Sequence, residues 1–456
     1  MQYITVIFTA LLALFYLFKT KRLYNSMTIF MGFWMLIIVL SSLQLDGMKE
    51  VKQRTYAYIF IGLASFALGS IISEILVRHK KEKTEFNFEL PKYVYGFLYI
   101  AIGIIILYSI YRMTLIFKFY QEGNTWREIR NMHGIAGEGG QGTLRGGNYS
   151  IMIHDLIVAP LVYMVLPAAV IEFFVGKRNK WLIGLSVLAI LFYSLGSVSR
   201  AVWVFAILYI GIIMVIFYFN KSIPKSSTKV LRAIPIILLV LILIVFGITM
   251  MRSGDSSVNF KYNALAYLTG GVSLFDMHLD GFASTIRTYG VFSLYGFLYP
   301  VFFVLHYLGI MRYPLLVDRV QYIKLYLEEF HKLSDHITMN AYSTMFFNFY
   351  SDFGVIGIIL GSAIFGIAAM YAYQNFIKNQ DFRTLLIYLI VVQFMLFSMA
   401  RIYTSLTTRA LSFIWILFIF PKNGGIIEKV ELYMLNILAK IFGVFNIKRK
   451  KEIGER

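Results

Sequence analysis

Residues 339–357 read MNAYSTMFFNFYSDFGVIG, and they join a long polar segment to a strongly apolar run. The stretch places an amide, hydroxyls, a carboxylate and two glycines directly before about 20 apolar residues, the length that crosses the hydrocarbon core of a bilayer. Polar side chains at such a junction lie where the chain passes from water into lipid. The stretch therefore predicts a membrane-spanning helix with a cluster of polar groups at its start.

The composition of the whole chain is that of a membrane protein. Of its 456 residues, 59% are hydrophobic and 15% are charged, and the mean hydropathy is +0.69. Backbone groups in lipid must bond within their own segment, and no alternating strand pattern is present, so the apolar runs are predicted as helices. We predict an all-α, polytopic helical bundle with about eleven spans. The predicted spans cover residues 3–18, 27–44, 56–77, 93–117, 151–174, 181–198, 201–219, 230–250, 354–376, 384–400 and 408–421.

Basic residues orient these spans, because cytoplasmic loops are rich in Lys and Arg. Basic clusters follow alternate spans, at residues 19–22, 78–83, 177–180 and 221–229, and the chain ends in a basic tail. They fall on one side if the N-terminus is outside and the C-terminus is cytoplasmic. Residues 49–54 are the exception, since they are basic and would lie outside. Cytoplasmic loops and anionic lipid then explain the net charge of +19, and no nucleic-acid partner is predicted.

The topology gives one membrane domain over residues 1–421 and a basic cytoplasmic tail over residues 422–456. Within the tail, residues 426–447 are predicted as an interfacial helix. Two long segments of the membrane domain lie outside, at residues 118–150 and 251–353. The first is rich in glycine and fits either a flexible linker or a mobile loop that carries arginines over a substrate.

The second outer segment contains an additional apolar stretch, YGFLYPVFFVLHYLG (295–309). As a span it would break the alternation of sides, so it is predicted as a re-entrant or interfacial helix. The first apolar run of the chain lacks a basic region before it and a cleavage site after it, which favours a retained span over a signal peptide. The chain has no cysteine, which excludes disulfides, thiolate metal sites and cysteine nucleophiles.

Arginine gathers on the predicted outer side, whereas lysine predominates on the predicted cytoplasmic side. The outer arginines are Arg54, Arg112, Arg127, Arg130, Arg145, Arg200, Arg252, Arg287, Arg312, Arg319, Arg401 and Arg409. A planar guanidinium group can grip phosphate through two parallel hydrogen bonds. The distribution suggests a site for an anionic ligand at the outer membrane boundary, and a diphosphate carried on a lipid fits that position. Taken singly, each arginine at a span end also fits an interfacial anchor.

The second outer segment also holds side chains suited to proton transfer. Asp276 and Asp280 share one face of a predicted helix, with His278 between them. A metal site would need more ligands in a fixed geometry, so no metal is predicted there. Farther along, His336 can act as a general base toward a sugar hydroxyl. Each of these histidines also fits an ordinary solvated loop residue.

Asp352 and the glycines that follow it have a structural interpretation. Because Asp favours helix N-termini, its carboxylate is suited to cap the span predicted over residues 354–376. Gly354 and Gly357 would allow close packing between helices. A capping role does not exclude a second role at a substrate site.

Three short motifs resemble those of a known family. NAYSTMFFNFYSDFGVIG (340–357), YLTGG (267–271) and the SVSR turn (197–200) are similar to features of oligosaccharide repeat unit polymerases, the Wzy-type O-antigen and capsule polymerases. The layout of many spans with one dominant outer loop late in the chain resembles that family too. The resemblance implies a GT-C-like membrane glycosyltransferase of the bacterial cytoplasmic membrane that needs no metal or other cofactor.

The resemblance also implies substrates and partners. The growing glycan is expected to pass from a polyprenyl-diphosphate carrier to a lipid-linked repeat unit at the outer face. The expected partners are lipid-linked oligosaccharides, membrane lipids and a chain-length regulator. Arg200, Arg252, Arg287 and Arg401 are expected to hold the leaving diphosphate. The expected proton acceptors are His336 first, then His278 and Asp276. The residues expected to hold the glycan are Asn340, Ser343 or Thr344, and Asp352.

Two other functions are alternatives. A glycan ligase of the O-antigen-ligase type differs only in its acceptor. A lipid-linked oligosaccharide flippase would carry charged residues along a central cavity and short loops, whereas this chain has few ionisable residues within its predicted spans and one long outer loop. Polymerase is the preferred interpretation.

Overall fold

The structure is a computed structural model that describes residues 1–44, 47–77, 88–131, 150, 152–219, 239–247, 260–335, 337–340 and 342–420. These residues are helical apart from turns, connections and one short antiparallel pair of strands, β1 (His331–Lys332) and β2 (Thr338–Met339). The predicted all-α class is therefore confirmed. The predicted tail and its interfacial helix at 426–447 lie outside the described residues.

Seven helical stretches of the described residues are long and apolar enough to cross a membrane. They are α1 (Gln2–Thr20), α3 (Gln53–Leu76), α4 (Lys92–Gln121), η2 (His154–Val158) with α7 (Ala159–Phe174), α8 (Lys180–Ser197), α14 (Thr344–Asn379), and α15 (Phe382–Leu396) with η4 (Phe397–Met399). The shorter apolar helices are α2 (Ser26–Ser42), α9 (Ala201–Phe219), α12 (Val291–Tyr307) and α16 (Thr407–Ile419). The protein is thus built as a helical membrane protein.

The less apolar elements lie between these helices in the chain. They are α5 (Trp126–Asn131), α11 (Phe260–Asp280), η3 (Phe282–Thr285), α13 (Leu315–Glu328) and η5 (Tyr403–Ser405). Of the span predicted over 230–250, residues 239–247 are described and are helical. The stretch predicted as re-entrant or interfacial corresponds to α12, a single apolar helix with Pro300 inside it.

Side-chain caps explain why several helices begin where they do. The Asn25 side chain accepts a hydrogen bond from the Met27 amide at 2.9 Å and starts α2. The Asn179 side chain accepts from the first turn of α8 in the same way. At α15, Asp381 and Thr384 form a reciprocal capping box. These oxygens satisfy backbone N–H groups that have no partner within their helix.

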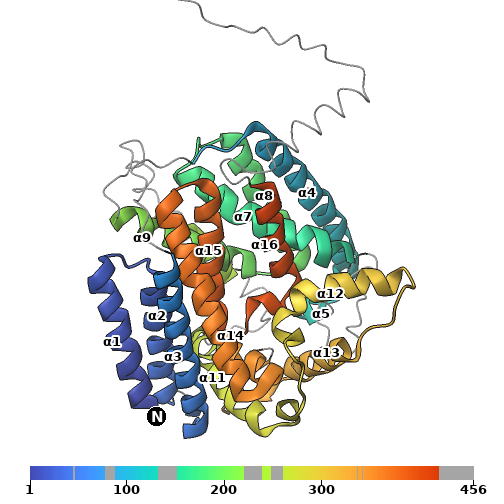
Figure 1. Ribbon diagram of the computed structural model, residues 1–456. Helices are drawn as coiled ribbons and strands as arrows, with labels where there is room; N and C mark the ends of the chain where they lie inside the picture. Colours follow the sequence, from blue (N-terminus) through green and yellow to red (C-terminus); the bar gives the residue numbers. More distant parts are fainter. Residues whose placement is uncertain are drawn as a thin grey trace, which may run out of the picture.

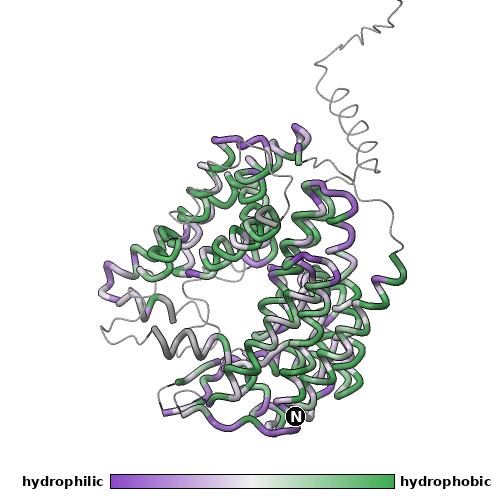
Figure 2. Tube along the Cα trace, turned by 90° about the vertical axis from the view of Figure 1, so that its left-hand side faces the viewer, coloured by the Kyte–Doolittle hydropathy of each residue, from purple (hydrophilic) through white to green (hydrophobic). Residues whose placement is uncertain are grey.

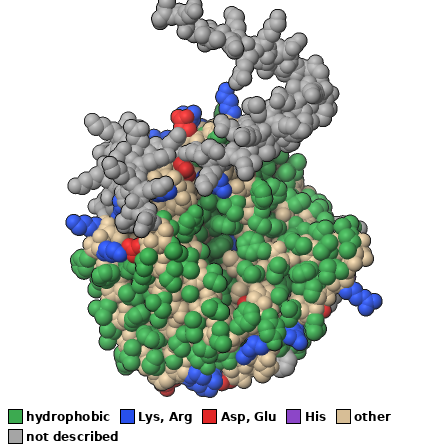
Figure 3. Space-filling model, in the orientation of Figure 1, with side chains coloured by type: hydrophobic (Ala, Val, Ile, Leu, Met, Phe, Trp, Pro, Cys, Tyr) green, Lys and Arg blue, Asp and Glu red, His purple; other side chains and the backbone are tan. Residues whose placement is uncertain are grey.

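The helices pack as a bundle in which α14 runs through the middle (Figure 1). Helices α1, α2 and α3 form a group on one side, and α4, α7 and α8 lie on the other. The tube in Figure 2 shows hydrophobic residues along the helices and hydrophilic residues gathered in the turns at their ends. Hydrophobic side chains also cover most of the face visible in Figure 3, as expected for a surface in contact with lipid.

Glycines allow α3 and α14 to approach closely. A Cβ atom on Gly69 would lie 2.0 Å from the Ala363 carbonyl oxygen, and one on Gly366 would lie 2.2 Å from the Phe66 carbonyl oxygen. Each helix therefore packs its backbone against a glycine of the other helix. Small residues at such contacts let dispersion forces act over a large area, which drives helix association in lipid.

We expect Gly69→Leu to destabilise the bundle by about 1–3 kcal/mol, because an added side chain must push α3 away from the α14 backbone. The measurement is thermal unfolding of the purified protein in detergent. The matched control is Gly103→Leu in α4, where a Cβ atom would meet nothing within 4 Å. Equal melting temperatures for the two variants would contradict the close approach of α3 and α14.

Helix α14 contains a kink that changes two predictions. Its backbone is non-helical at Phe353 and at Gly354, whose φ is +65°. The predicted span start at residue 354 thus corresponds to the second half of α14, and a first helical half begins earlier, at Thr344. The predicted packing role of Gly354 and Gly357 is corrected: Gly354 permits the kink, and a Cβ on Gly357 would lie 2.0 Å from the Phe349 carbonyl oxygen of the same helix.

Two of the basic residues in 49–54, the segment that disagreed with the charge rule, share one acidic partner. Lys52 Nζ lies 2.5 Å from one carboxylate oxygen of Asp280, and Arg54 Nη2 lies 2.7 Å from the other. The contact puts this loop and the C-terminal end of α11 on the same side of the bundle. That placement agrees with the predicted topology, in which both are outside.

Candidate functional site

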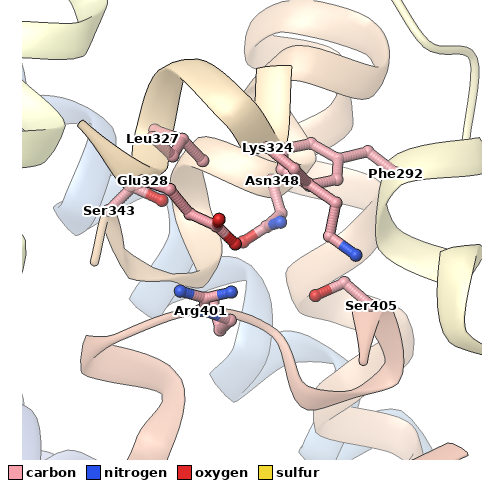
Figure 4. Close-up of a pocket in the computed structure, with 8 residues that line it drawn as sticks. All are labelled: Phe292, Lys324, Leu327, Glu328, Ser343, Asn348, Arg401 and Ser405. Carbon is pink, nitrogen blue, oxygen red and sulfur yellow. The ribbon is translucent and has the colours of Figure 1, made fainter. Parts of the chain in front are cut away.

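A polar pocket lies where α12, α13 and α14 meet the segment that leads into α16. It is partly open to solvent. Its lining residues are Phe292, Lys324, Leu327, Glu328, Ser343, Asn348, Arg401 and Ser405. In Figure 4 the Lys324 amine and the Arg401 guanidinium group approach the space from two sides, and the Glu328 carboxylate and Asn348 amide point toward its middle.

Hydrogen bonds between the segments fix the walls of this pocket. The Asn340 amide donates to the Glu328 carbonyl oxygen at 2.8 Å, which ties the end of α13 to the chain before α14. The Ser343 backbone N–H donates to the Ala400 carbonyl oxygen at 2.8 Å, and the Ile402 N–H donates to Asn348 Oδ1 at 3.3 Å. Arg401 therefore lies on a short segment held on both sides to the start of α14.

The electrostatics of the pocket centre on Lys324 and Arg401. Burial and the nearby Arg401 guanidinium lower the pKa of Lys324 to about 7, whereas Glu328 and Asp155 act in the opposite direction. The Lys324 amine also lies 3.9 Å from the centre of the Tyr295 ring, a cation–π contact. The pocket thus holds an amine whose charge can change near neutral pH beside a permanently charged guanidinium.

Two buried hydroxyl groups next to the pocket have no hydrogen-bond partner among the described residues, those of Ser343 and Thr344. Thr344 also adopts a φ of +64°, which is unusual for a β-branched residue. A buried hydroxyl without a partner costs free energy unless something bonds to it. The Ser343 hydroxyl lines the pocket, so a ligand or water in the pocket can supply that bond.

One of the arginines predicted to hold diphosphate lines the pocket, and a second acts on a tyrosine next to it. Arg401 lines the pocket, and Arg200 donates to the Tyr267 hydroxyl at 2.9 Å. Burial and the neighbouring Tyr267 raise the pKa of Tyr342 to about 12. The Arg401 and Arg200 guanidinium groups both act in the opposite direction on that pKa. Tyr342 therefore lies within the field of both cations, next to the pocket residue Ser343.

The other two predicted arginines are not placed at the pocket. Arg287 donates to the Ser284 and Ile286 carbonyl oxygens at 2.5 and 3.3 Å, and its guanidinium lies 5.0 Å from the centre of the Tyr350 ring. These contacts hold the connection between α11 and α12. Arg252 lies outside the described residues.

The predicted proton acceptors are also dispersed. Asp276 Oδ1 accepts hydrogen bonds from the Thr55 hydroxyl and from the Lys52 amide, so its carboxylate secures the start of α3. His278 is fully buried, and burial together with the neighbouring His331 lowers its pKa to about 3. A histidine held neutral in that way is a weak base. His336 lies outside the described residues.

The predicted glycan-binding residues divide between the pocket and its supports. Ser343 lines the pocket, and Asn340 supports it through the Glu328 carbonyl. Asp352 is 2% exposed and accepts hydrogen bonds from the Thr288 hydroxyl at 2.6 Å and from the Phe292 and Ser293 amides at 3.1 Å. It therefore caps α12, and the prediction that it caps the span after it is wrong.

Sequence reasoning missed Lys324, Glu328, Asn348 and Ser405. Lys324 and Glu328 are four residues apart on α13, a spacing that also describes an ordinary solvated helix face. Asn348 is an isolated amide in the apolar run MFFNFY, and Ser405 is one of several hydroxyl residues in RIYTSLTTR, so neither was singled out. Within the part of the chain that the structure describes, no three His, Asp or Glu side chains converge as metal ligands.

Comparison with models of known protein families, with curated proteins and with solved structures finds no match for this chain. Its function is therefore inferred from the pocket and from the motifs of its sequence.

We expect the affinity of the pocket for inorganic diphosphate, used as a probe of its two cations, to fall about tenfold between pH 6 and pH 8, because Lys324 loses its proton as the pH rises through its pKa of about 7. Below that pH the amine is charged and attracts the ligand; above it the amine is neutral. The measurement is a series of binding titrations with the purified protein in detergent.

Lys324→Arg is the control, because a guanidinium keeps its charge across this range. Ionisation of the ligand affects both proteins alike, so the difference between the two curves isolates Lys324. The same pH dependence in both proteins would show that Lys324 does not bind the diphosphate.

Proposed function

We propose that this chain is a repeat unit polymerase of the bacterial cytoplasmic membrane, acting in O-antigen, capsule or exopolysaccharide synthesis. It transfers a growing glycan from its polyprenyl-diphosphate carrier to a lipid-linked oligosaccharide repeat unit at the outer face. The observation that carries this proposal is the pocket with Lys324 and Arg401 in its walls, formed where the outer segment meets the start of α14.

The pocket supports phosphate binding for three reasons. The Arg401 guanidinium offers a planar set of donors that matches phosphate oxygens, and Lys324 adds a second cation. Ser343 adds a hydroxyl with no partner among the described residues. Two apolar helices, α12 and α14, contribute to the pocket walls, which supports a ligand whose polyprenyl chain remains in lipid while its diphosphate enters the pocket.

The reaction that fits these groups is a single displacement at the anomeric carbon. The oxygen of an acceptor-sugar hydroxyl forms a bond to that carbon and its proton passes to a base, while the bond from the carbon to the diphosphate oxygen breaks. The electron pair leaves with the diphosphate, and Lys324 and Arg401 stabilise the added negative charge. Preorganised charge of this kind is usually the largest contribution to catalysis, and one displacement inverts the anomeric configuration.

The test uses purified protein in lipid vesicles with lipid-linked repeat units extracted from cells that lack this chain. A ladder of glycan lengths on the lipid carrier is the expected result. Transfer of a glycan to a different acceptor without a ladder would indicate a ligase. Movement of the lipid across the vesicle membrane without any new glycosidic bond would indicate a flippase, and either outcome would overturn the proposal.

A further inference from the structure

A second polar group lies at the start of the span formed by η2 and α7. His154 Nδ1 is 2.6 Å from Asp155 Oδ1, and His154 Nε2 is 3.1 Å from the Tyr193 hydroxyl. The His154 ring stacks parallel to Tyr193, with ring centres 5.8 Å apart, and its other neighbour is Tyr108 at 5.9 Å. The His154 and Asp155 side chains are 30% and 37% exposed, so a ligand can reach them.

The backbone around this pair is unusual. Residues 154–158 form a turn of π-helix, in which the Ala159 amide bonds to the His154 carbonyl oxygen. Pro160 follows and has no N–H to return to the preceding turn, which favours the wider turn. Such turns are rare and occur frequently at functional sites.

The two contacts suit one neutral form of the His154 ring. An ionised carboxylate can only accept hydrogen bonds, so in this form Nδ1 carries the proton that faces Asp155. Nε2 then keeps its lone pair and accepts from the Tyr193 hydroxyl. Tyr163 lies beside Tyr193 and offers its hydroxyl another partner when its place at Nε2 is taken. The pair has the arrangement in which a carboxylate orients a histidine as a general base.

This pair belongs to the same part of the molecule as the phosphate pocket. The negative charge of Asp155 acts on Lys324, since it favours the charged form of that amine. The π-helical turn contacts α16. Helix α16 begins at Thr407, two residues after the pocket residue Ser405. The His154–Asp155 pair and the pocket therefore lie near each other in the bundle.

We propose that His154, oriented by Asp155, takes the proton from the acceptor-sugar hydroxyl. This inference rests on the proposed polymerase function. The acceptor hydroxyl replaces Tyr193 at Nε2 and gives its proton to that nitrogen as its oxygen bonds to the anomeric carbon. The electron pair of the broken bond leaves with the diphosphate, and His154 later releases the proton to water. Asp155 is a positioning residue that holds the ring and its tautomer.

The experiment measures glycan polymerisation and undecaprenyl diphosphate binding separately in the full chain. We expect His154→Ala and His154→Gln to lower the polymerisation rate about 100-fold or more, which is the usual contribution of a general base, while the dissociation constant for undecaprenyl diphosphate stays within about twofold. Added imidazole should restore part of the rate in His154→Ala. Asp155→Asn should lower kcat with little change in KM. The matched control is His306→Ala, because His306 is an exposed histidine at the end of α12.

The outcomes separate this inference from the proposed function. If the wild-type protein polymerises the glycan and the His154→Gln variant is equally active, the role of His154 is overturned and the proposed polymerase function stands. The same is true if Glu328→Gln abolishes the reaction while the His154 variants retain it. If the wild-type chain forms no new glycosidic bond, the proposed function and this inference both fail. Melting temperatures close to the wild-type value show that the variants are folded.

Discussion

Arg401→Ala is expected to lower the polymerisation rate about 100- to 1,000-fold, because removal of one preorganised donor from a transition-state charge site costs about 2.7–4 kcal/mol. The guanidinium lies in the pocket wall on a segment that two hydrogen bonds, to the Ser343 amide and the Asn348 side chain, hold against the start of α14. It therefore does not need to reorganise as the charge develops. Arg401→Lys should recover part of the rate but not all of it, since an ammonium group cannot form the paired hydrogen bonds of a guanidinium.

The measurement is the initial rate of ladder formation from extracted lipid-linked repeat units, together with binding of undecaprenyl diphosphate. Arg312→Ala is the matched control, because Arg312 is an exposed arginine of the same outer segment and should keep the wild-type rate. A folded Arg401→Ala variant that forms glycan within threefold of the wild-type rate would remove Arg401 from the site. Because the loss is expected in the rate more than in binding, the two measurements also separate transition-state stabilisation from simple ligand attraction.

The helical elements were predictable because the signals that form them are local. Apolar runs of span length set most of the helices, and caps such as Asn25 and Asn179 set their starts. The observed helix boundaries differ from the predicted ones where the backbone departs from regular helical geometry, which the pattern of apolar residues does not encode. The kink at Phe353 and Gly354 lets α14 begin ten residues earlier than the predicted span, at Thr344 and not at 354.

The pocket was less predictable because its walls come from segments far apart in the chain. Arg401 was proposed from its position at a span end. In sequence, Lys324 resembles any lysine on a helix of alternating polar and apolar residues, and only the packing of α13 beside Arg401 identifies it as a pocket residue. The same limit applies to Arg409, whose position at a span end in the sequence is typical of an interfacial anchor. In the structure it is 6% exposed, and its guanidinium lies 3.0 Å from the centre of the Tyr163 ring and 4.4 Å from that of Phe205. Long-range packing, which no local pattern encodes, decides whether such a charge meets water, an aromatic ring or a ligand.

For Asp352 the predicted role as a helix cap was correct, but the helix that it was predicted to cap was wrong. The preference of Asp for helix N-termini was sound, but the helix it caps is 60 residues away in sequence and reaches it only in the folded bundle. Its carboxylate binds the Thr288 hydroxyl and the first free amides of α12, at Phe292 and Ser293. Those amides carry the positive end of the helix dipole, so a buried negative charge is stabilised there.

Asp352→Ala is therefore expected to destabilise the protein by about 3–5 kcal/mol, because it leaves the Thr288 hydroxyl and two buried amides without their charged acceptor. Asp352→Asn keeps one acceptor oxygen and should lose less. The measurement is thermal unfolding in detergent together with hydrogen exchange at the start of α12. Asp318→Ala, at an exposed aspartate in the first turn of α13, is the control and should melt like the wild-type protein.

The same variant separates the two roles assigned to Asp352. If its carboxylate only held the glycan, Asp352→Ala would lower polymerisation and leave the melting temperature and the exchange of α12 unchanged. In the capping role stability falls first, and activity follows because Phe292, whose amide Asp352 holds, also lines the pocket. Faster exchange confined to α12, with α3 and the second half of α14 still protected, would identify the cap as a local support of the pocket.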